Sequence, residues 1–191
     1  MIDKSILPLL FEHFLTELMS EKFQTNIKVK ITKLKNGINL PIPEYKTQGA
    51  SGVDLYAAID EHNGFDGSIF LSKNTYKEIP TGIALEIPKG YEAQIRPRSG
   101  WSKDYGISVL NSPGTIDSDY RGELIILLIN LGEKTVEIKR GDRIAQLVFA
   151  PVVKADIIEV DTLESSLRGE KGFGSTGFEL DVLKKTESSN Q

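Results

Sequence analysis

Residues 75–96 read Thr-Tyr-Lys-Glu-Ile-Pro-Thr-Gly-Ile-Ala-Leu-Glu-Ile-Pro-Lys-Gly-Tyr-Glu-Ala-Gln-Ile-Arg, and they show how this chain is built. Strand-length runs at 75–79, 82–87 and 91–96 are separated by Pro and Gly. Short runs bounded by turn residues are typical of all-β sandwiches and barrels. Further runs recur at 53–58, 68–71, 107–110, 123–130, 134–139, 143–150 and 156–160. The spacing therefore predicts an all-β fold.

The run Leu124–Ile129 consists of apolar residues only. A half-exposed strand alternates between apolar and polar side chains, as residues 27–32 do, whereas a continuously apolar strand is covered on both faces. We therefore expect a second sheet or another subunit to cover residues 124–129.

The two ends of the chain depart from the strand pattern. Near the N-terminus, apolar residues recur at spacings of three and four, at Ile6, Leu9, Leu10, Phe14 and Leu18. This pattern predicts a short amphipathic helix, packed on its own domain or docked on a partner. We expect an N-terminal helical extension over 1–23, a β domain over 24–167 and a glycine-rich C-terminal segment over 168–191.

Composition restricts the chemistry. The 191 residues carry a formal net charge of −4 at pH 7, which argues against binding a nucleic-acid polymer. There is no Cys, and the only histidines are His13 and His62, so thiolate chemistry is excluded and a Ser-His-Asp triad is disfavoured. Catalysis would then depend on carboxylates, hydroxyls and cations. Any metal would be a hard, oxygen-binding ion such as Mg²⁺. No apolar run approaches the ~20 residues of a membrane span, so we expect no membrane contact and a cytoplasmic location.

The segment Arg168–Gly177 has the glycine spacing of a dinucleotide-binding fingerprint. That fingerprint needs a following helix and an acidic residue about 20 positions further on, and too few residues remain after Gly177. Its backbone N–H groups, with Arg168 and Lys171, suit a polyphosphate, and Phe173 suits stacking on a base. The alternative is a structureless tail.

Two further segments carry candidate chemistry. Arg96-Pro-Arg-Ser-Gly100 offers a guanidinium, a hydroxyl and an amide to a phosphate, the alternative being a salt-bridged surface turn. Asn111-Ser-Pro-Gly114 predicts a type II turn at the head of a hairpin. Alternation beyond this turn places Asp117 and Asp119 on one face, where one carboxylate stays charged as a base while a cation holds the other.

Together these segments resemble the five motifs of the trimeric dUTPases (deoxyuridine triphosphate nucleotidohydrolases), in the order of that family. The motifs are Ala50–Ala57, Arg96–Gly100, Asn111–Glu123, Gly141–Pro151 and Arg168–Gly177. The resemblance runs from Ile27 to Gly177, and Trp101 departs from it, because most relatives carry Leu there.

The resemblance implies a jelly-roll-like distorted β-barrel that forms a homotrimer with shared active sites, with residues 1–23 outside the family core. It implies a dUTP diphosphatase that uses Mg²⁺ and releases dUMP and pyrophosphate, which keeps uracil out of DNA and supplies dUMP for thymidylate synthesis. In this picture Asp117 activates the water that attacks the α-phosphorus, Asp54 reaches the metal through water, and segment 168–177 closes as a lid.

The resemblance also implies which residues bind the phosphates and which bind the nucleoside of the substrate. The phosphates would be held by Arg98, Ser99, Gly100, Gln146, Arg168, Ser175 and Thr176. Uracil and deoxyribose would be held by Asn111, Thr115, Ile116, Tyr120 and Phe173.

Two rival functions use the same fold. A dCTP deaminase needs a catalytic Glu in the strand after the hairpin, and that position is Leu127 here, which cannot transfer protons. A nucleotide-binding regulator without turnover would be expected to lose its base or its lid, and Asp117, Arg168 and Phe173 are all present.

Overall fold

The computed structural model describes residues 26–60 and 67–172. The predicted N-terminal helix and three predicted ligand-binding residues, Phe173, Ser175 and Thr176, lie outside these ranges. The chain divides into two compact units, Met1–Val153 and Lys154–Gln191.

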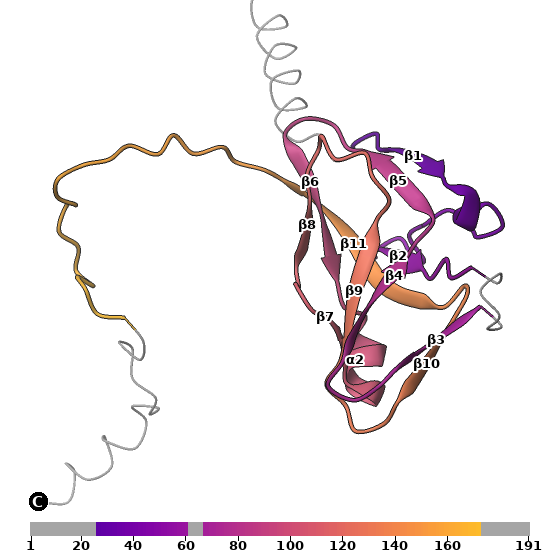
Figure 1. The fold of residues 1–191 in the computed structure, drawn as a ribbon. Coiled ribbons are helices and arrows are strands. Elements are labelled where there is room, and N and C mark those ends of the chain that lie inside the picture. The colour runs from indigo at the N-terminus through magenta and orange to yellow at the C-terminus, as the bar shows by residue number, and fades with distance from the viewer. Residues whose placement is uncertain (1–25, 61–66, 173–191) are drawn as a thin grey trace, which may run out of the picture. The chain divides into compact units, whose positions relative to one another are not determined.

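The described part of the first unit is built almost entirely of strands (Figure 1). The strands are β1 (Lys30–Lys33), β2 (Val53–Tyr56), β3 (Ser68–Leu71), β4 (Tyr76–Pro80), β5 (Ile83–Glu86), β6 (Tyr91–Arg96), β7 (Ile107–Val109), β8 (Gly114–Ile116), β9 (Ile125–Asn130), β10 (Val136–Lys139) and β11 (Arg143–Pro151). The helices are a 3₁₀ turn, η1 (Lys35–Gly37), and one α-helix, α2 (Ser99–Tyr105). The predicted all-β class is confirmed.

The strands form four antiparallel sheets, with the orders β2-β11-β6-β8, β4-β9-β7, β1-β5 and β3-β10. Neighbouring strands are mostly distant in sequence, as where β11 lies between β2 and β6. This arrangement is the predicted jelly-roll-like fold, although the ladders among the described residues do not join into one closed barrel.

One apolar core lies inside these sheets. Its members without exposed surface include Leu55, Leu71, Ile79, Leu124, Ile126, Leu128 and Ile138. Along β9 the burial alternates, with Ile126 and Leu128 inside and Ile125 exposed on the outer face. The core therefore covers one face of this apolar strand, whereas the residues of the outer face are exposed or half-buried, so the described chain itself does not supply the cover predicted for both faces.

Helix α2 was not predicted from the sequence. It follows directly on β6 and packs Trp101 against the core, with the rings of Trp101 and Tyr105 edge to face at 6.4 Å. It ends at Gly106, whose φ of 70° is left-handed and whose N–H donates to the carbonyl of Ser102. A glycine after a short polar run is the sequence signal for such an end.

Three local predictions are wrong. Gly114 lies in β8 without the positive φ that a type II turn requires at this position, so the turn is not type II. Strands β7 and β8 belong to different sheets and form no hairpin with each other. The chain turns at 117–120, so strand alternation does not relate Asp117 to Asp119, although both carboxylates are exposed.

The described residues of the second unit, 154–172, contain no helix or strand, so the predicted strand at 156–160 is also wrong. Its apolar side chains have no cover, since Ile157 is 96% exposed and Leu163 is 88% exposed. A strand needs a ladder partner, and none is available to this segment among the described residues. No helix in the described part of the chain is long and apolar enough to cross a membrane.

Candidate active site

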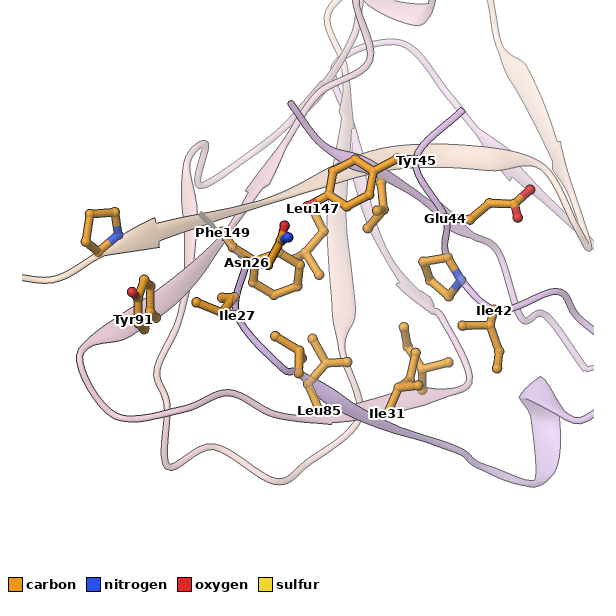
Figure 2. A pocket seen from close by; sticks show the side chains of 15 residues that line it. Asn26, Ile27, Ile31, Ile42, Glu44, Tyr45, Leu85, Tyr91, Leu147 and Phe149 are labelled. Atoms are coloured by element: carbon orange, nitrogen blue, oxygen red, sulfur yellow. The ribbon is translucent and has the colours of Figure 1, made fainter. Parts of the chain in front are cut away.

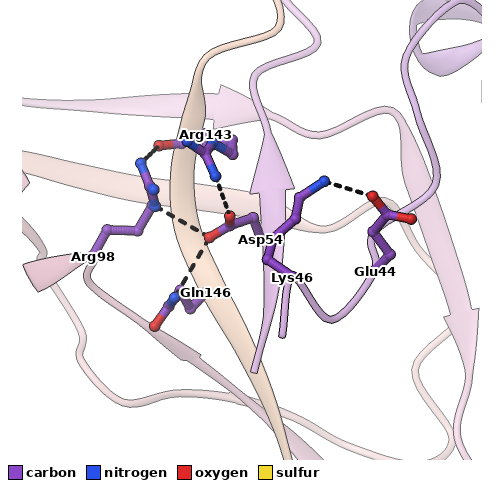
Figure 3. Close-up of polar contacts among 6 residues, drawn as sticks. All are labelled: Glu44, Lys46, Asp54, Arg98, Arg143 and Gln146. Atoms are coloured by element: carbon purple, nitrogen blue, oxygen red, sulfur yellow. Dashed lines mark hydrogen bonds and ion pairs between the residues drawn. The ribbon is translucent and has the colours of Figure 1, made fainter. Parts of the chain in front are cut away.

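A buried carboxylate, Asp54 in β2, is the centre of a polar cluster (Figure 3). Its Oδ1 accepts a hydrogen bond from Nε of Arg98 at 3.1 Å, and its Oδ2 accepts one from Nη1 of Arg143 at 3.0 Å. Nε2 of Gln146 lies 3.5 Å from Oδ1. Burial of a carboxylate is costly unless it is paired, and here two guanidinium groups pair one carboxylate.

The sheet sets this geometry. Gln146 in β11 lies directly opposite Asp54 in β2 on one side and opposite Arg96 in β6 on the other. Arg98 follows β6 by two residues, and its Nη1 also donates to the backbone oxygen of Arg143 at 3.0 Å. With two Arg and one Asp, the cluster has a surplus positive charge, which attracts an anion such as a phosphate.

The structure brings together three of the predicted site residues, Asp54, Arg98 and Gln146. Ser99 and Gly100 begin α2 directly after Arg98, and both are exposed. The predicted phosphate-binding group within the first unit is therefore one contiguous surface.

The predicted base and nucleoside-binding residues lie in β8, the edge strand of the same sheet, and in the turns that flank it. Asp117 is exposed, and its carbonyl accepts a hydrogen bond from the N–H of Tyr120 at 3.2 Å. Thr115 and Ile116 lie in β8, and the side chain of Asn111 lies over Gly114. Across the described ranges, no side-chain hydrogen bond or ion pair joins Asp117 or Tyr120 to the Asp54 cluster.

Hydrogen bonds within the loop after β8 and to neighbouring segments fix its backbone. Nη1 of Arg121 donates to the carbonyls of Ser118 and Tyr120 at 2.7 and 2.8 Å, and the Tyr120 hydroxyl donates to the carbonyl of Glu123 at 3.0 Å. The Glu123 carboxylate accepts hydrogen bonds from the side chain of Asn36 and the N–H of Gly82. The loop is thus anchored while its carboxylate stays in solvent.

In the second unit, Arg168 is exposed, and its side-chain hydrogen bonds among the described residues are to the carbonyls of Lys171 and Gly172. Its Nε donates to the carbonyl of Lys171 at 2.9 Å. Its predicted neighbours in the glycine-rich segment, Phe173, Ser175 and Thr176, lie outside the described residues.

The opposite face of the β2–β11 sheet borders an apolar groove of about 430 Å³ (Figure 2). Val53 and Leu147 line the groove, and each is the chain neighbour of a cluster residue. Successive strand side chains point to opposite faces, so the sheet separates the groove from the Asp54 cluster. The carboxylate of Glu44 at its rim is bound to Lys46, whose hydrogen bond lowers the pKa of Glu44. The described residues that line the groove include no Lys or Arg.

Arg143 is the cluster residue that the sequence analysis missed. Its place in a predicted strand gave it no role, because in a regular strand it would point away from the face of Gln146. The signal was present in the paired apolar residues Ile144-Ala145, which interrupt the period of two between Arg143 and Gln146.

Comparison with known proteins agrees with this geometry. A family model described as dUTPase matches residues 39–177. The deoxyuridine 5'-triphosphate nucleotidohydrolase of Ehrlichia canis (strain Jake) is 51% identical over 159 residues, which cover 82% of this chain and 99% of that protein. The protein of the same name from Beijerinckia indica is 50% identical over 150 residues, covering 78% of this chain and 91% of its own. A structure of the Staphylococcus bacteriophage 80alpha dUTPase with dUpNHpp matches with a TM-score of 0.69 and 27% identity, covering 80% of this chain and 100% of that one.

Proposed function

Because the chain belongs to the dUTPase family and hydrolyses dUTP to dUMP and pyrophosphate, we propose that it does so in a site shared between copies of the chain. The observation that carries this proposal is the separation of two half-sites. The Asp54 cluster has the cations for a triphosphate, and the loop at 111–120 has the base and the nucleoside-binding groups, yet no side-chain contact joins them within the described chain. A second copy would bring the two half-sites together.

The phosphates bind at the Asp54 cluster in this proposal. Arg98 offers its planar fork of donors, and Ser99, Gly100 and Gln146 add a hydroxyl, an amide N–H and an amide side chain on the same surface. Arg168, Ser175 and Thr176 of the C-terminal segment then close over the γ-phosphate as a lid.

Asp117 is the general base. It is exposed, and in this proposal its carboxylate takes a proton from water as that water attacks the α-phosphorus. The bond from the α-phosphorus to the bridging oxygen of the β-phosphate breaks, and pyrophosphate leaves with the bonding electrons. The products are dUMP and pyrophosphate, and neither Cys nor His is needed.

Uracil and deoxyribose bind in the loop at 111–120. The side chain of Asn111 and the main-chain groups of Thr115 and Ile116 read uracil, and the ring of Tyr120 lies under the sugar, where it excludes a 2'-hydroxyl. The bond from Tyr120 to Glu123 supports this role, because it fixes the ring. Phe173 of the lid stacks on the base.

Mg²⁺ fits this site as an ion brought by the substrate. Among the described residues, no group of three or more His, Cys, Asp or Glu side chains could hold a metal. Oδ2 of Asp54 accepts one bond, from Arg143, and a carboxylate oxygen has room for two, so Asp54 can reach a metal-bound water. When bound, Mg²⁺ neutralises and orients the triphosphate.

The assembly in this proposal is a homotrimer. The outer face of β9, with Ile125 exposed and Leu127 and Ile129 half-buried, offers an apolar surface to another copy. The uncovered apolar side chains of 154–163 also support packing against another chain. The cytoplasmic location stays a prediction.

The test measures pyrophosphate release by the full chain from dUTP, dCTP, dTTP and UTP, with and without Mg²⁺. We expect release from dUTP alone, stimulated by Mg²⁺, and a loss of at least ~10²-fold in kcat for Asp117→Asn, the scale of a positioned general base. Affinity for dUpNHpp should be unchanged.

The control is Asp119→Asn, which removes a neighbouring exposed carboxylate from the same turn. It should retain kcat within a few-fold. Equal losses in the two variants, or near-normal turnover by Asp117→Asn, would remove Asp117 from the mechanism.

A further inference from the structure

A β-bulge in β11 decides which way Arg143 points. In the ladder with β2, Gln146 lies opposite Asp54 and Ala145 opposite Leu55, but Arg143 lies opposite Tyr56. The extra residue on β11 is Ile144, and both Ile144 and Ala145 are fully buried. Bulges of this kind re-aim a side chain, and they are frequent beside active sites.

The alternation of side chains along a strand shows why the bulge matters for Arg143. Residues 143 and 146 are three apart, so in a regular strand their side chains would point to opposite faces. The bulge brings the side chains of Arg143 and Gln146 back to the same face, because their ladder partners, Tyr56 and Asp54, share one face of β2. Arg143 thereby reaches Asp54 from the same face as Gln146 (Figure 3).

Asp54, Arg98 and Arg143 form a closed triangle. Arg98 donates to Oδ1 of Asp54 and to the backbone oxygen of Arg143, and Arg143 donates to Oδ2 of Asp54. The side chain of Asp54 is 6% exposed, that of Arg98 is 22% exposed and that of Arg143 is 45% exposed. The Asp54 carboxylate and the backbone oxygen of Arg143 thus take Nε–H and one Nη1–H of the Arg98 guanidinium, so Asp54 competes for part of the group that the proposed function assigns to the phosphates.

A triphosphate that takes Arg98 removes one of the two charged partners of a buried carboxylate. Leaving such a carboxylate unpaired is strongly unfavourable. Arg143 is the charged partner that remains, because its bond is to the other carboxylate oxygen.

We propose that Arg143 is a positioning residue of the phosphate site: the bulge at Ile144 places it on Asp54, and it keeps that carboxylate paired when the triphosphate takes Arg98. The inference rests on the proposed phosphate-binding role of Arg98. It differs from a direct phosphate contact, because Arg143 acts through Asp54.

The test is a double-mutant cycle on binding. We would measure the affinity of the full chain for dUpNHpp and for deoxyuridine, which has no phosphate, in the wild type, Arg143→Gln, Asp54→Asn and the double variant. Arg143→Gln should weaken dUpNHpp binding about tenfold and leave deoxyuridine binding unchanged, the scale of coupled neighbours. In the Asp54→Asn background the same change should cost less than about twofold, because the neutral amide does not need a cationic partner.

Two control variants complete the design. Arg143→Lys keeps one charged donor for Oδ2 and should restore most of the dUpNHpp affinity. Arg96→Gln removes the same charge from the same sheet face, where Arg96 is bonded to Gln94 and not to Asp54, and should change the affinity far less. The fluorescence of Trp101, in the helix that follows Arg98, and the unfolding temperature establish that each variant is folded.

An equal loss in both Asp54 backgrounds would overturn the proposal in favour of a direct phosphate contact. So would full affinity in Arg143→Gln, or an equal loss in Arg96→Gln, which would indicate a general charge effect. Failure of the wild type to bind dUpNHpp more tightly than deoxyuridine would contradict the proposed phosphate site itself, and is distinguishable from these outcomes.

Discussion

Gly106 joins helix α2 to the rest of the core. Its φ is 70°, and a Cβ built on it would lie 2.6 Å from the backbone of Gly132. Its carbonyl accepts a hydrogen bond from the N–H of Leu131 at 3.0 Å, so the end of α2 is tied to the end of β9. The position of Ser99 and Gly100 therefore depends on a close backbone contact that only glycine permits.

Gly106→Ala should lower the free energy of unfolding by roughly 3 kcal/mol, since it adds a backbone clash to the ~1–3 kcal/mol strain of a left-handed non-glycine residue. Gly90→Ala is the matched control, because Gly90 has a φ of 85° and open space around it. It should cost only the strain, about 1 kcal/mol. Urea unfolding measures both values, and equal losses would show that the contact with Gly132 contributes nothing.

At the scale of elements, strands were predictable where the hydrophobic period was clear. The runs around β3, β6 and β9 were found because apolar residues alternate or repeat between Pro and Gly boundaries. Helix α2 and strand β8 were missed because each is short and its conformation is fixed by tertiary contacts. The bulge that aims Arg143 depends on strand pairing, which a one-dimensional pattern does not specify.

The C-terminal segment was predicted as an element without core contacts. The predicted bounds are 168–191, and the described residues of this segment, 168–172, are exposed and contain no helix or strand; within them Arg168 donates to the carbonyls of Lys171 and Gly172. Truncation after Leu167 should therefore leave the unfolding temperature within about 2 °C of the full chain, since the described residues that it removes, 168–172, are all exposed. It should cut kcat/KM for dUTP at least ~10²-fold, because Arg168 and Phe173 are lost.

Thermal unfolding followed by circular dichroism and steady-state pyrophosphate release test this pair of expectations. Full-rate hydrolysis by the truncated chain would contradict the lid, while leaving the role of Asp117 intact. A large fall in unfolding temperature would instead show that the segment is part of the fold.

At the scale of the whole molecule, the resemblance predicted both the site residues and their division among copies of the chain. Asp54, Arg98 and Gln146 gather on one sheet face, whereas Asp117 and Tyr120 lie in the loop after β8. The apolar outer face of β9 supplies a reason for copies to associate. In the proposed function, a complete active site therefore exists only in the assembly of copies.

The most direct test of this shared site is complementation between two inactive variants. Arg98→Gln and Asp117→Asn are each expected to be inactive as homotrimers, and light scattering should show a trimer for both. When the two chains are co-expressed in equal amounts and purified as mixed trimers, about a third of the sites combine an intact Arg98 from one copy with an intact Asp117 from another, as a head-to-tail ring of copies requires. We predict dUTP hydrolysis at about that fraction of the wild-type rate. Mixed trimers as inactive as either parent would contradict the account, because each site would then be contained within one chain.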